Sequence, residues 1–209
     1  MKPQNSNQDN QISGLLCIDK PEGCTSFDVV RKVRRALSVR RVGHGGTLDP
    51  LATGLLVVLV GKASKLQDIV MGGVKRYQGL IKIGMATDTD DITGETLSTS
   101  TENFNLCSTE FRDRIAQIAV KYTGQIDQIP PQYSSIKVQG KRSYALARSG
   151  KSVEHRPRQV EIYQLELEAV SESELSYNLV CSKGTYVRSL ARDIGEDLGL
   201  GACVKSIRR

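Results

Sequence analysis

The sequence predicts an α+β protein whose central sheet is mixed, largely antiparallel and flanked by helices. Two observations predict this class. Segments that alternate apolar and polar residues, as half-buried strands do, are interspersed with segments whose apolar residues recur at helical spacing. The strand-like segments also follow one another at hairpin distances. No internal repeat and no Pro-, Gly- or Ser-rich linker divides the chain, so we expect one domain over residues 14–209, preceded by a disordered, Gln- and Asn-rich tail over residues 1–13.

In the first third of the chain, strands are predicted at 14–18 and 55–60, because both are unbroken apolar runs that end at turn residues. Between them lies a predicted helix, capped at its start by Thr25 or Ser26. Apolar residues recur on one face of this helix, and we expect that face to be buried. These residues are Phe27, Val30, Val33 and Leu37.

The rest of the chain continues this pattern of strands and helices. The alternation changes parity between Ile162 and Leu165, which predicts a β-bulge. Glycines follow the predicted helices and are natural stops for them. Strands are predicted at 75–84, 135–138, 160–169 and 175–181, and helices at 109–122, 143–148 and 187–198.

Composition narrows the class of protein. The chain has 29 Lys and Arg against 23 Asp and Glu, a net charge of +6. This excess suits a polyanion such as RNA, although many soluble proteins carry a similar charge without such a partner. The five cysteines are never spaced as CxxC, which indicates reduced thiols. With no signal-like start and no apolar run long enough for a bilayer, we expect a cytoplasmic protein with no membrane partner.

Positive charge is concentrated on the first predicted helix and just after it. Two interpretations stay open: a solvated helix face, or an edge that contacts phosphates and leads into the loop that follows. The residues are Arg31, Lys32, Arg34, Arg35, Arg40 and Arg41.

That loop, residues 43–54, combines four glycines, His44 and a single carboxylate, Asp49. Glycine tolerates positive φ and close approach of a ligand, so Asp49 would be held on a constrained loop beside a buried strand. This is a suitable place for a catalytic acid. Asp-Pro is also common in plain turns. Tyr77 on a strand and Arg188 on a helix likewise have structural alternatives, as a core tyrosine and a surface ion-pair partner.

Several familiar motifs are excluded. The glycine cluster lacks both the ending of a P-loop and the spacing of a dinucleotide site. Residues 88–94 superficially resemble a calcium loop, but Ile92 occupies a ligand position and no Glu stands at the twelfth, which favours an acidic turn. His44 and His155 are too far apart to anchor a metal alone, and a Ser/His/Asp triad has no nucleophile elbow to support it.

Six blocks, in order and without large gaps, resemble the TruB family of tRNA pseudouridine-55 synthases. The resemblance implies the pseudouridine synthase fold and an isomerase that converts the T-loop uridine of tRNA from an N-glycoside to a C-glycoside. It also implies no metal, nucleotide or redox cofactor, and tRNA bound through its T-arm. We expect a monomer. The blocks are 14–21, 43–54, 75–77, 87–94, 129–135 and 181–188.

The resemblance assigns the chemistry to three residues. Asp49 matches the family's nucleophile and Arg188 the cation that offsets the cost of desolvating an ionised carboxylate. Tyr77 matches a tyrosine that stacks on the flipped uracil, with a possible part in proton transfer at C5. Whether Asp49 attacks the ribose, attacks the base or assists elimination stays open.

Other residues are assigned to binding and support. His44 matches a histidine that contacts the RNA, Tyr186 lies beside the same base in the family, and Ile207 takes the place of a pocket leucine. Supporting roles under the pocket fall to Lys20, Pro21, Gly45 and Gly46.

Most bacterial members continue into a C-terminal PUA domain, for which residues 14–209 contain no counterpart. Two other functions share some of these features. An RNA-binding or tRNA-folding protein with secondary or lost catalysis would also use the basic residues. A glycoside hydrolase acting on free nucleosides would need a second positioned carboxylate, and none is evident near Asp49.

Overall fold

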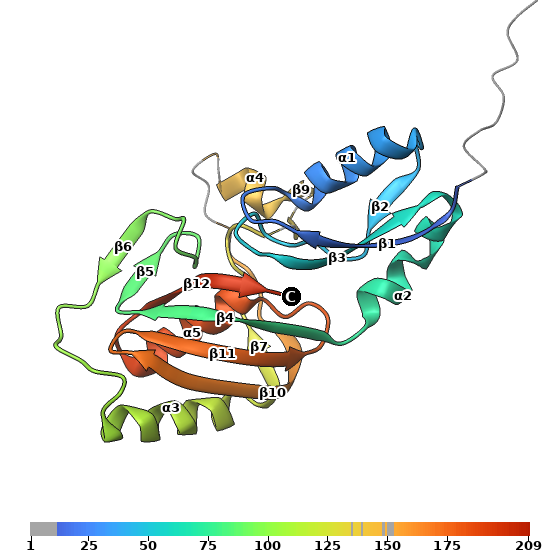
Figure 1. Cartoon of the computed structure of the whole chain (residues 1–209). Coiled ribbons are helices and arrows are strands. Elements are labelled where there is room, and N and C mark those ends of the chain that lie inside the picture. Colours follow the sequence, from blue (N-terminus) through green and yellow to red (C-terminus); the bar gives the residue numbers. More distant parts are fainter. Residues whose placement is uncertain (1–11, 135, 139, 148, 150–152) are drawn as a thin grey trace, which may run out of the picture. The chain divides into compact units, whose positions relative to one another are not determined.

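A computed structural model of the chain describes residues 12–134, 136–138, 140–147, 149 and 153–209 (Figure 1). The chain forms two compact units. Unit 1 comprises Met1–Gly73 with Arg208–Arg209, and unit 2 comprises Val74–Ile207. The sequence predicts one domain over residues 14–209. That the two units act together as this one domain stays a prediction. Residues 1–11 of the expected tail lie outside the described residues.

Unit 1 is built on an antiparallel sheet with the strand order β1-β3-β2. The strands are β1 (Gly14–Lys20), β2 (Val42–His44) and β3 (Gly54–Val60). In their register Lys20 stands opposite Gly54, which places the end of β1 beside the loop that leads into β3. The predicted strands at 14–18 and 55–60 are confirmed, although Leu55 is exposed.

Helix α1 (Ser26–Leu37) lies on one face of this sheet (Figure 1). Its N-cap is Thr25, in a capping box with Asp28. The expectation that Phe27 is buried is wrong, because 53% of its surface is exposed. The buried stripe runs through Val29, Val30 and Val33, and Phe27 stands two residues before Val29, about 200° away around the helix.

The sheet leads into two further helical segments, η2 (Gly61–Leu66) and α2 (Gln67–Gly72). Near their start, the Ser13 Oγ accepts a hydrogen bond from the Lys62 backbone N–H at 3.0 Å. No helix in the described ranges is both long and apolar enough to cross a membrane.

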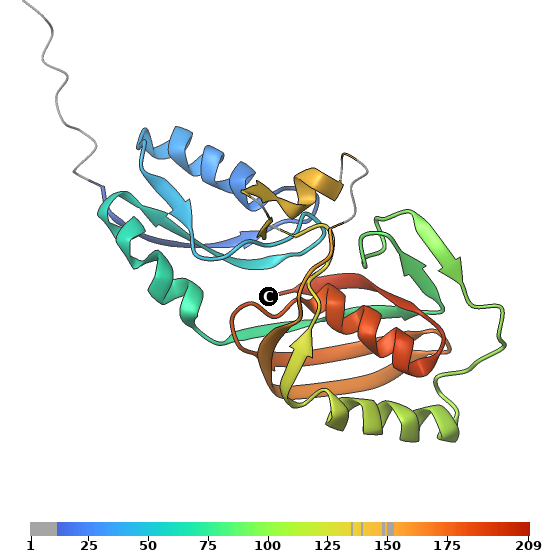
Figure 2. The same ribbon diagram turned by 180° about the vertical axis from the view of Figure 1, so that it is seen from behind.

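Unit 2 is built on a five-stranded sheet with the order β12-β4-β11-β10-β7. β4, β11, β10 and β7 pair as antiparallel neighbours, which confirms the expected α+β class with a largely antiparallel sheet. α5 (Val187–Leu198) lies against one face of this sheet (Figure 2), and α3 (Thr109–Lys121) runs beside β10. The strands are β4 (Lys75–Ile83), β7 (Gly124–Gln128), β10 (Arg158–Ser171), β11 (Glu174–Cys181) and β12 (Ala202–Arg208).

Details of unit 2 match the sequence pattern closely. The register of β10 against β11 shifts between Ile162 and Gln164, which confirms the predicted bulge. Ser135, Arg148 and Gly150 of the predicted strand and short helix lie outside the described residues. The smaller elements are β5 (Met85–Thr87), β6 (Thr96–Thr99), β8 (Lys137–Val138), β9 (Lys141–Arg142) and α4 (Ser143–Ala147).

Candidate active site

The backbone before Asp49 is fixed by a serine of α1. The Ser26 Oγ accepts a hydrogen bond from the Leu48 N–H at 2.8 Å and donates one to the Leu48 carbonyl at 3.1 Å. Both Ser26 and Leu48 are buried. After Asp49, its own carbonyl accepts from the Ala52 N–H at 3.0 Å and closes a turn. The half-buried Asp49 is therefore held by a backbone with defined partners on both sides.

Lys20 forms a hydrogen bond with the next residue of the loop, Pro50. Its side chain is completely buried, and Nζ donates to the carbonyls of Pro21 at 2.8 Å, Cys24 at 2.8 Å and Pro50 at 3.2 Å. Burial lowers the pKa of Lys20, and the negative charge of Asp49 is among the influences that oppose this shift. Lys20 thus ties the turn after β1 to the residue that follows Asp49.

The far end of the loop is held by Arg209. Its backbone N–H donates to the Thr53 carbonyl at 3.1 Å, and its carbonyl accepts from the Leu55 N–H at 3.0 Å. Its guanidinium donates to the carbonyls of Leu55 at 2.8 Å and Gly46 at 3.3 Å. Gly54 has a φ of 98°, and a methyl group there would overlap the Arg209 carbonyl. Only glycine fits this position without strain.

His44 ends β2 at the entrance to the same loop and is half-buried. Burial lowers its pKa, and the positive charge of Arg209 lowers it further. Gly45 follows, with its N–H donating to the Val57 carbonyl at 2.8 Å. The predicted residues Asp49, His44, Gly45 and Gly46 therefore lie in one loop of unit 1. Lys20 ends β1 and Pro21 follows it, and the Lys20–Pro50 hydrogen bond connects them to that loop.

The remaining predicted residues belong to unit 2. Tyr77 is half-buried on β4, opposite Leu179 of β11. Two residues along, Gly79 faces Tyr177, whose hydroxyl donates to the Ser206 carbonyl of β12 at 3.0 Å. Burial raises the pKa of Tyr177, and the neighbouring phenol of Tyr77 adds to this.

Tyr186, just before α5, is positioned by Gln128. The Gln128 Oε1 accepts from the Tyr186 N–H at 2.8 Å, and its Nε2 donates to the Tyr186 carbonyl at 3.0 Å. Gln128 is buried, and sequence reasoning did not single it out. The signal available was a polar residue ending a strand directly before the block at 129–135.

Arg188 is buried at the start of α5 and is not a surface ion-pair residue. Its Nη1 donates to the Thr89 carbonyl and its Nη2 to the Tyr133 carbonyl, both at 2.9 Å. Its Nη1 also lies 3.9 Å from the Asp91 carboxylate. Arg188 therefore connects two matched blocks, 87–94 and 129–135, to the helix.

Residues 88–94 form the predicted acidic turn. The Asp91 Oδ1 accepts hydrogen bonds from the Thr93 N–H at 3.0 Å and from the hydroxyls of Thr93 at 2.6 Å and Thr89 at 3.0 Å. Asp90 lies 3.1 Å from Arg192, and burial nevertheless raises its pKa to about 6. Over the described residues, no group of three or more His, Cys, Asp or Glu is arranged to hold a metal ion.

Comparison with known proteins places these features in a family. The profile of the TruB family pseudouridylate synthase N-terminal domain matches residues 34–187. Among its relatives, a tRNA pseudouridine synthase B of Nitrosococcus oceani is 43% identical over all of this chain and 66% of its own length. One of Endomicrobium trichonymphae is 44% identical over 96% of this chain and 85% of its own. The chain spans 64–68% of the length of four curated relatives that it matches.

Solved structures share the fold of this chain. A crystal structure of a Cbf5-Nop10-Gar1 complex contains a chain that is 28% identical to this one, with a TM-score of 0.68 over 94% of this chain and 47% of that chain. A second, an H/ACA RNP bound to a substrate RNA containing 2'-deoxyuridine, is 25% identical, with a TM-score of 0.66 over 96% of this chain and 47% of that chain. The chain belongs to the TruB family of pseudouridylate synthases.

Proposed function

We propose that the protein isomerises the T-loop uridine of tRNA to pseudouridine. The family and the names of relatives that are 40–44% identical support this reaction and this substrate. The observation that carries the proposal is the fixation of the backbone around Asp49 by Ser26 and Lys20. A nucleophile must be positioned before it reacts, because misplacement by about 1 Å is costly in rate.

Asp49 is the proposed nucleophile and Arg188 its proposed charge partner. The reaction breaks the bond between C1′ and N1, turns the base and forms a bond between C1′ and C5. The C5 proton leaves to solvent and N1 gains one, so no oxidant or external group is consumed. An ionised carboxylate in a water-poor pocket needs a fixed cation, and the guanidinium of a buried arginine is pre-organised for that task.

The uridine must leave the RNA stack to reach such a pocket. Tyr77 is the proposed stacking surface, because a π-face holds the ring and still allows rotation between cleavage and re-attachment. Tyr186 and Ile207 are proposed to line the base pocket, and His44 to contact the RNA. We further propose that residues 14–209 act as one catalytic domain, as a monomer and without a metal ion.

The test uses unmodified tRNA carrying tritium at uracil C5. Wild-type protein should release tritium and leave pseudouridine at a single T-loop position. Asp49→Asn should bind the RNA with wild-type affinity and release none. Asp68→Asn, at an exposed carboxylate of α2, is the matched control and should react normally.

The same assay distinguishes the proposed reaction from the main alternative, an RNA-folding protein without catalysis. If wild-type protein binds tRNA but frees no tritium, the catalytic proposal is wrong. Equal acceleration of tRNA refolding by the wild type and by Asp49→Asn would then identify an RNA-folding protein.

A further inference from the structure

The net positive charge of this protein comes from one of its two units. Unit 1 contains twelve Lys or Arg and six Asp or Glu, whereas unit 2 contains seventeen of each. The entire net charge of +6 therefore belongs to unit 1. Half of the positive residues of unit 1 fall within 31–41, and Asp28 is the nearest acidic residue before them in the sequence.

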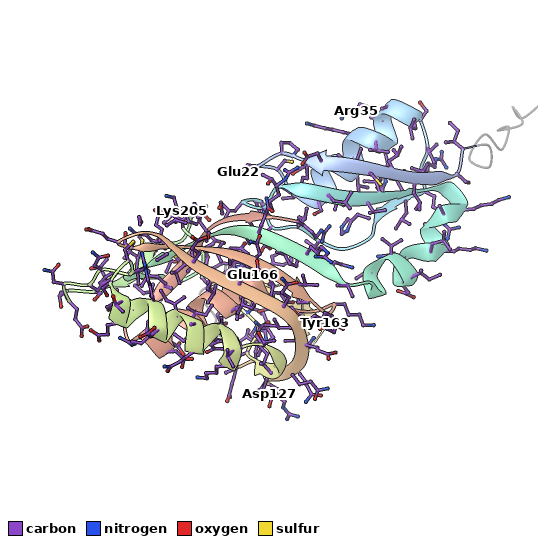
Figure 3. All side chains as sticks on the ribbon, turned by 60° about the horizontal axis from the view of Figure 1, so that its bottom comes forward. Glu22, Arg35, Asp127, Tyr163, Glu166 and Lys205 are labelled. Atoms are coloured by element: carbon purple, nitrogen blue, oxygen red, sulfur yellow. The ribbon has the colours of Figure 1, made fainter. Side chains whose placement is uncertain are left out.

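Four of these six residues belong to helix α1, and Arg40 and Arg41 follow it. Val29, Val30 and Val33 turn toward the sheet of unit 1 and are buried. Arg31 and Arg35 are exposed, on the opposite side of the helix. Figure 3 shows Arg35 on the side of α1 that faces away from the sheet. We name Arg31, Lys32, Arg34, Arg35, Arg40 and Arg41 the basic face.

An exposed aromatic ring organises part of the basic face. The guanidinium carbons of Arg31 and Arg34 lie 5.9 and 5.6 Å from the centre of the Phe27 ring. Arg34 also donates to the Val42 carbonyl at 2.8 Å. Cation–π contacts and this hydrogen bond limit the freedom of both side chains, so less entropy is lost when they meet an anion.

Little negative charge opposes the basic face. Asp28 pairs with Arg31 and is also engaged by the Thr25 cap. In the described parts of the chain, no carboxylate lies within ion-pair distance of Lys32, Arg35 or Arg41. A surface on which positive charges outnumber the negative charges that face them favours an external polyanion.

We propose that the basic face is a second RNA-binding surface that contacts the phosphate backbone of the substrate outside the uridine pocket. This inference rests on the proposed function for the identity of the polyanion. Guanidinium groups bind phosphate oxygens in a bidentate manner, and the uniform charge suits a backbone rather than a base sequence. The surface would therefore add affinity without choosing the uridine.

The test compares two triple variants with equal loss of charge. Lys32→Gln/Arg35→Gln/Arg41→Gln removes the basic-face cations for which the described residues supply no carboxylate within ion-pair distance. Lys62→Gln/Lys65→Gln/Arg112→Gln removes three exposed cations elsewhere and is the control.

Affinity for an unmodified tRNA transcript is measured from low to moderate salt. The first variant should bind at least about tenfold more weakly, with a salt dependence of log K smaller by about 2 to 3, since each phosphate contact contributes about 0.9. The control should stay within about threefold, because charges away from the RNA are screened over about 10 Å.

Two further measurements separate this inference from catalysis and from misfolding. At saturating RNA, the basic-face variant should release tritium at the wild-type rate. Lys32→Arg/Arg35→Lys/Arg41→Lys, which keeps the charge, should restore binding. Equal weakening by both triple variants, or no weakening by either, would overturn the inference and point to bulk charge or to a protein partner. Wild-type protein that binds RNA but frees no tritium would refute only the proposed reaction.

Discussion

The Ser26 hydroxyl bonds to both backbone groups of Leu48, accepting from its N–H at 2.8 Å and donating to its carbonyl at 3.1 Å. In unit 2 the Gln128 amide does the same to Tyr186, at 2.8 and 3.0 Å. In each case a buried side chain bonds to both the N–H and the carbonyl of one residue, and the Tyr186 carbonyl also accepts from the Leu190 N–H at 3.1 Å. Leu48 directly precedes the proposed nucleophile Asp49, and Tyr186 stands two positions before its proposed charge partner Arg188.

Ser26→Ala should reduce turnover more than RNA binding. The Leu48 N–H and carbonyl would be buried without their partner, at a cost of about 1–3 kcal/mol in stability. The turn that carries Asp49 would also loosen. Urea unfolding and single-turnover tritium release measure the two effects, with Ser98→Ala on the exposed strand β6 as control. Unchanged turnover in a destabilised variant would show that Ser26 serves folding alone.

Gln128→Leu should leave the Tyr186 N–H and carbonyl without their side-chain partner. We expect stability to fall by about 1–3 kcal/mol and the apparent affinity for RNA to fall with it, because Tyr186 is proposed to line the base pocket. Gln117→Leu, at an exposed position of α3, is the matched control. Wild-type behaviour of Gln128→Leu in both measurements would contradict this role.

Lys20→Met should be among the most damaging changes in unit 1. Methionine keeps the length of the buried chain but leaves the three carbonyls without the ammonium that they share. We expect a loss of about 2–4 kcal/mol in unfolding free energy, since hydrogen bonds to a charged group exceed neutral ones. Lys65→Met, at an exposed site, should be nearly neutral. A stable Lys20→Met protein with full activity would exclude the supporting role.

Gly54→Ala and Gly43→Ala test the loop backbone at its two ends. At Gly54 a methyl group meets the Arg209 backbone at a positive φ, whereas at Gly43 it meets nothing within 4 Å. Gly54→Ala should lower the midpoint of thermal unfolding markedly and Gly43→Ala should leave it nearly unchanged. Similar midpoints for the two variants would argue against a close approach by Arg209.

His44 should make stability depend on pH below neutrality. Its pKa in the folded protein is lower than the usual 6.5, so the unfolded chain takes up the proton more readily. The stability that neutral His44 contributes is therefore complete above about pH 6.5 and is lost as the pH falls through the lowered pKa. Urea unfolding at pH 7.5 and 5.5 should show a smaller difference for His44→Asn than for the wild type.

The cause of the shift can be checked separately. Arg209→Gln should raise the pKa of His44 in an NMR titration, because it removes a positive charge. His155→Asn assigns the signals, since these are the two histidines of the chain. A pKa for His44 that is unmoved by Arg209→Gln would leave burial as the sole cause.

The sequence was sufficient for features that depend on neighbouring residues. The start of α1, the bulge of β10 and the turn at 88–94 follow from a cap, periodicity and turn chemistry within a few positions. Phe27 was placed wrongly because Val30 and Val33 alone define the buried stripe poorly, and Val29 decides its direction.

The residues that position the site were harder to predict for a physical reason. Ser26, Gln128 and Arg209 act on partners 22, 58 and 154 positions away, so no local pattern marks them. The roles of Asp49, Tyr77 and Arg188 came from the resemblance to a family and stay predictions until the variants are measured.

The return of Arg208 and Arg209 to unit 1 has a consequence for biosynthesis. Asp19 pairs with Arg208, and the backbones of Thr53 and Leu55 form hydrogen bonds with the backbone of Arg209. The part of the chain that is synthesised first therefore gains contacts from residues that are synthesised about 150 positions later. A ribosome-bound chain halted before Arg208 would carry β3 and the Asp49 loop without these contacts. Protection of that loop from protease should therefore arise abruptly, when Arg208 and Arg209 become available to unit 1, rather than gradually as unit 1 is synthesised.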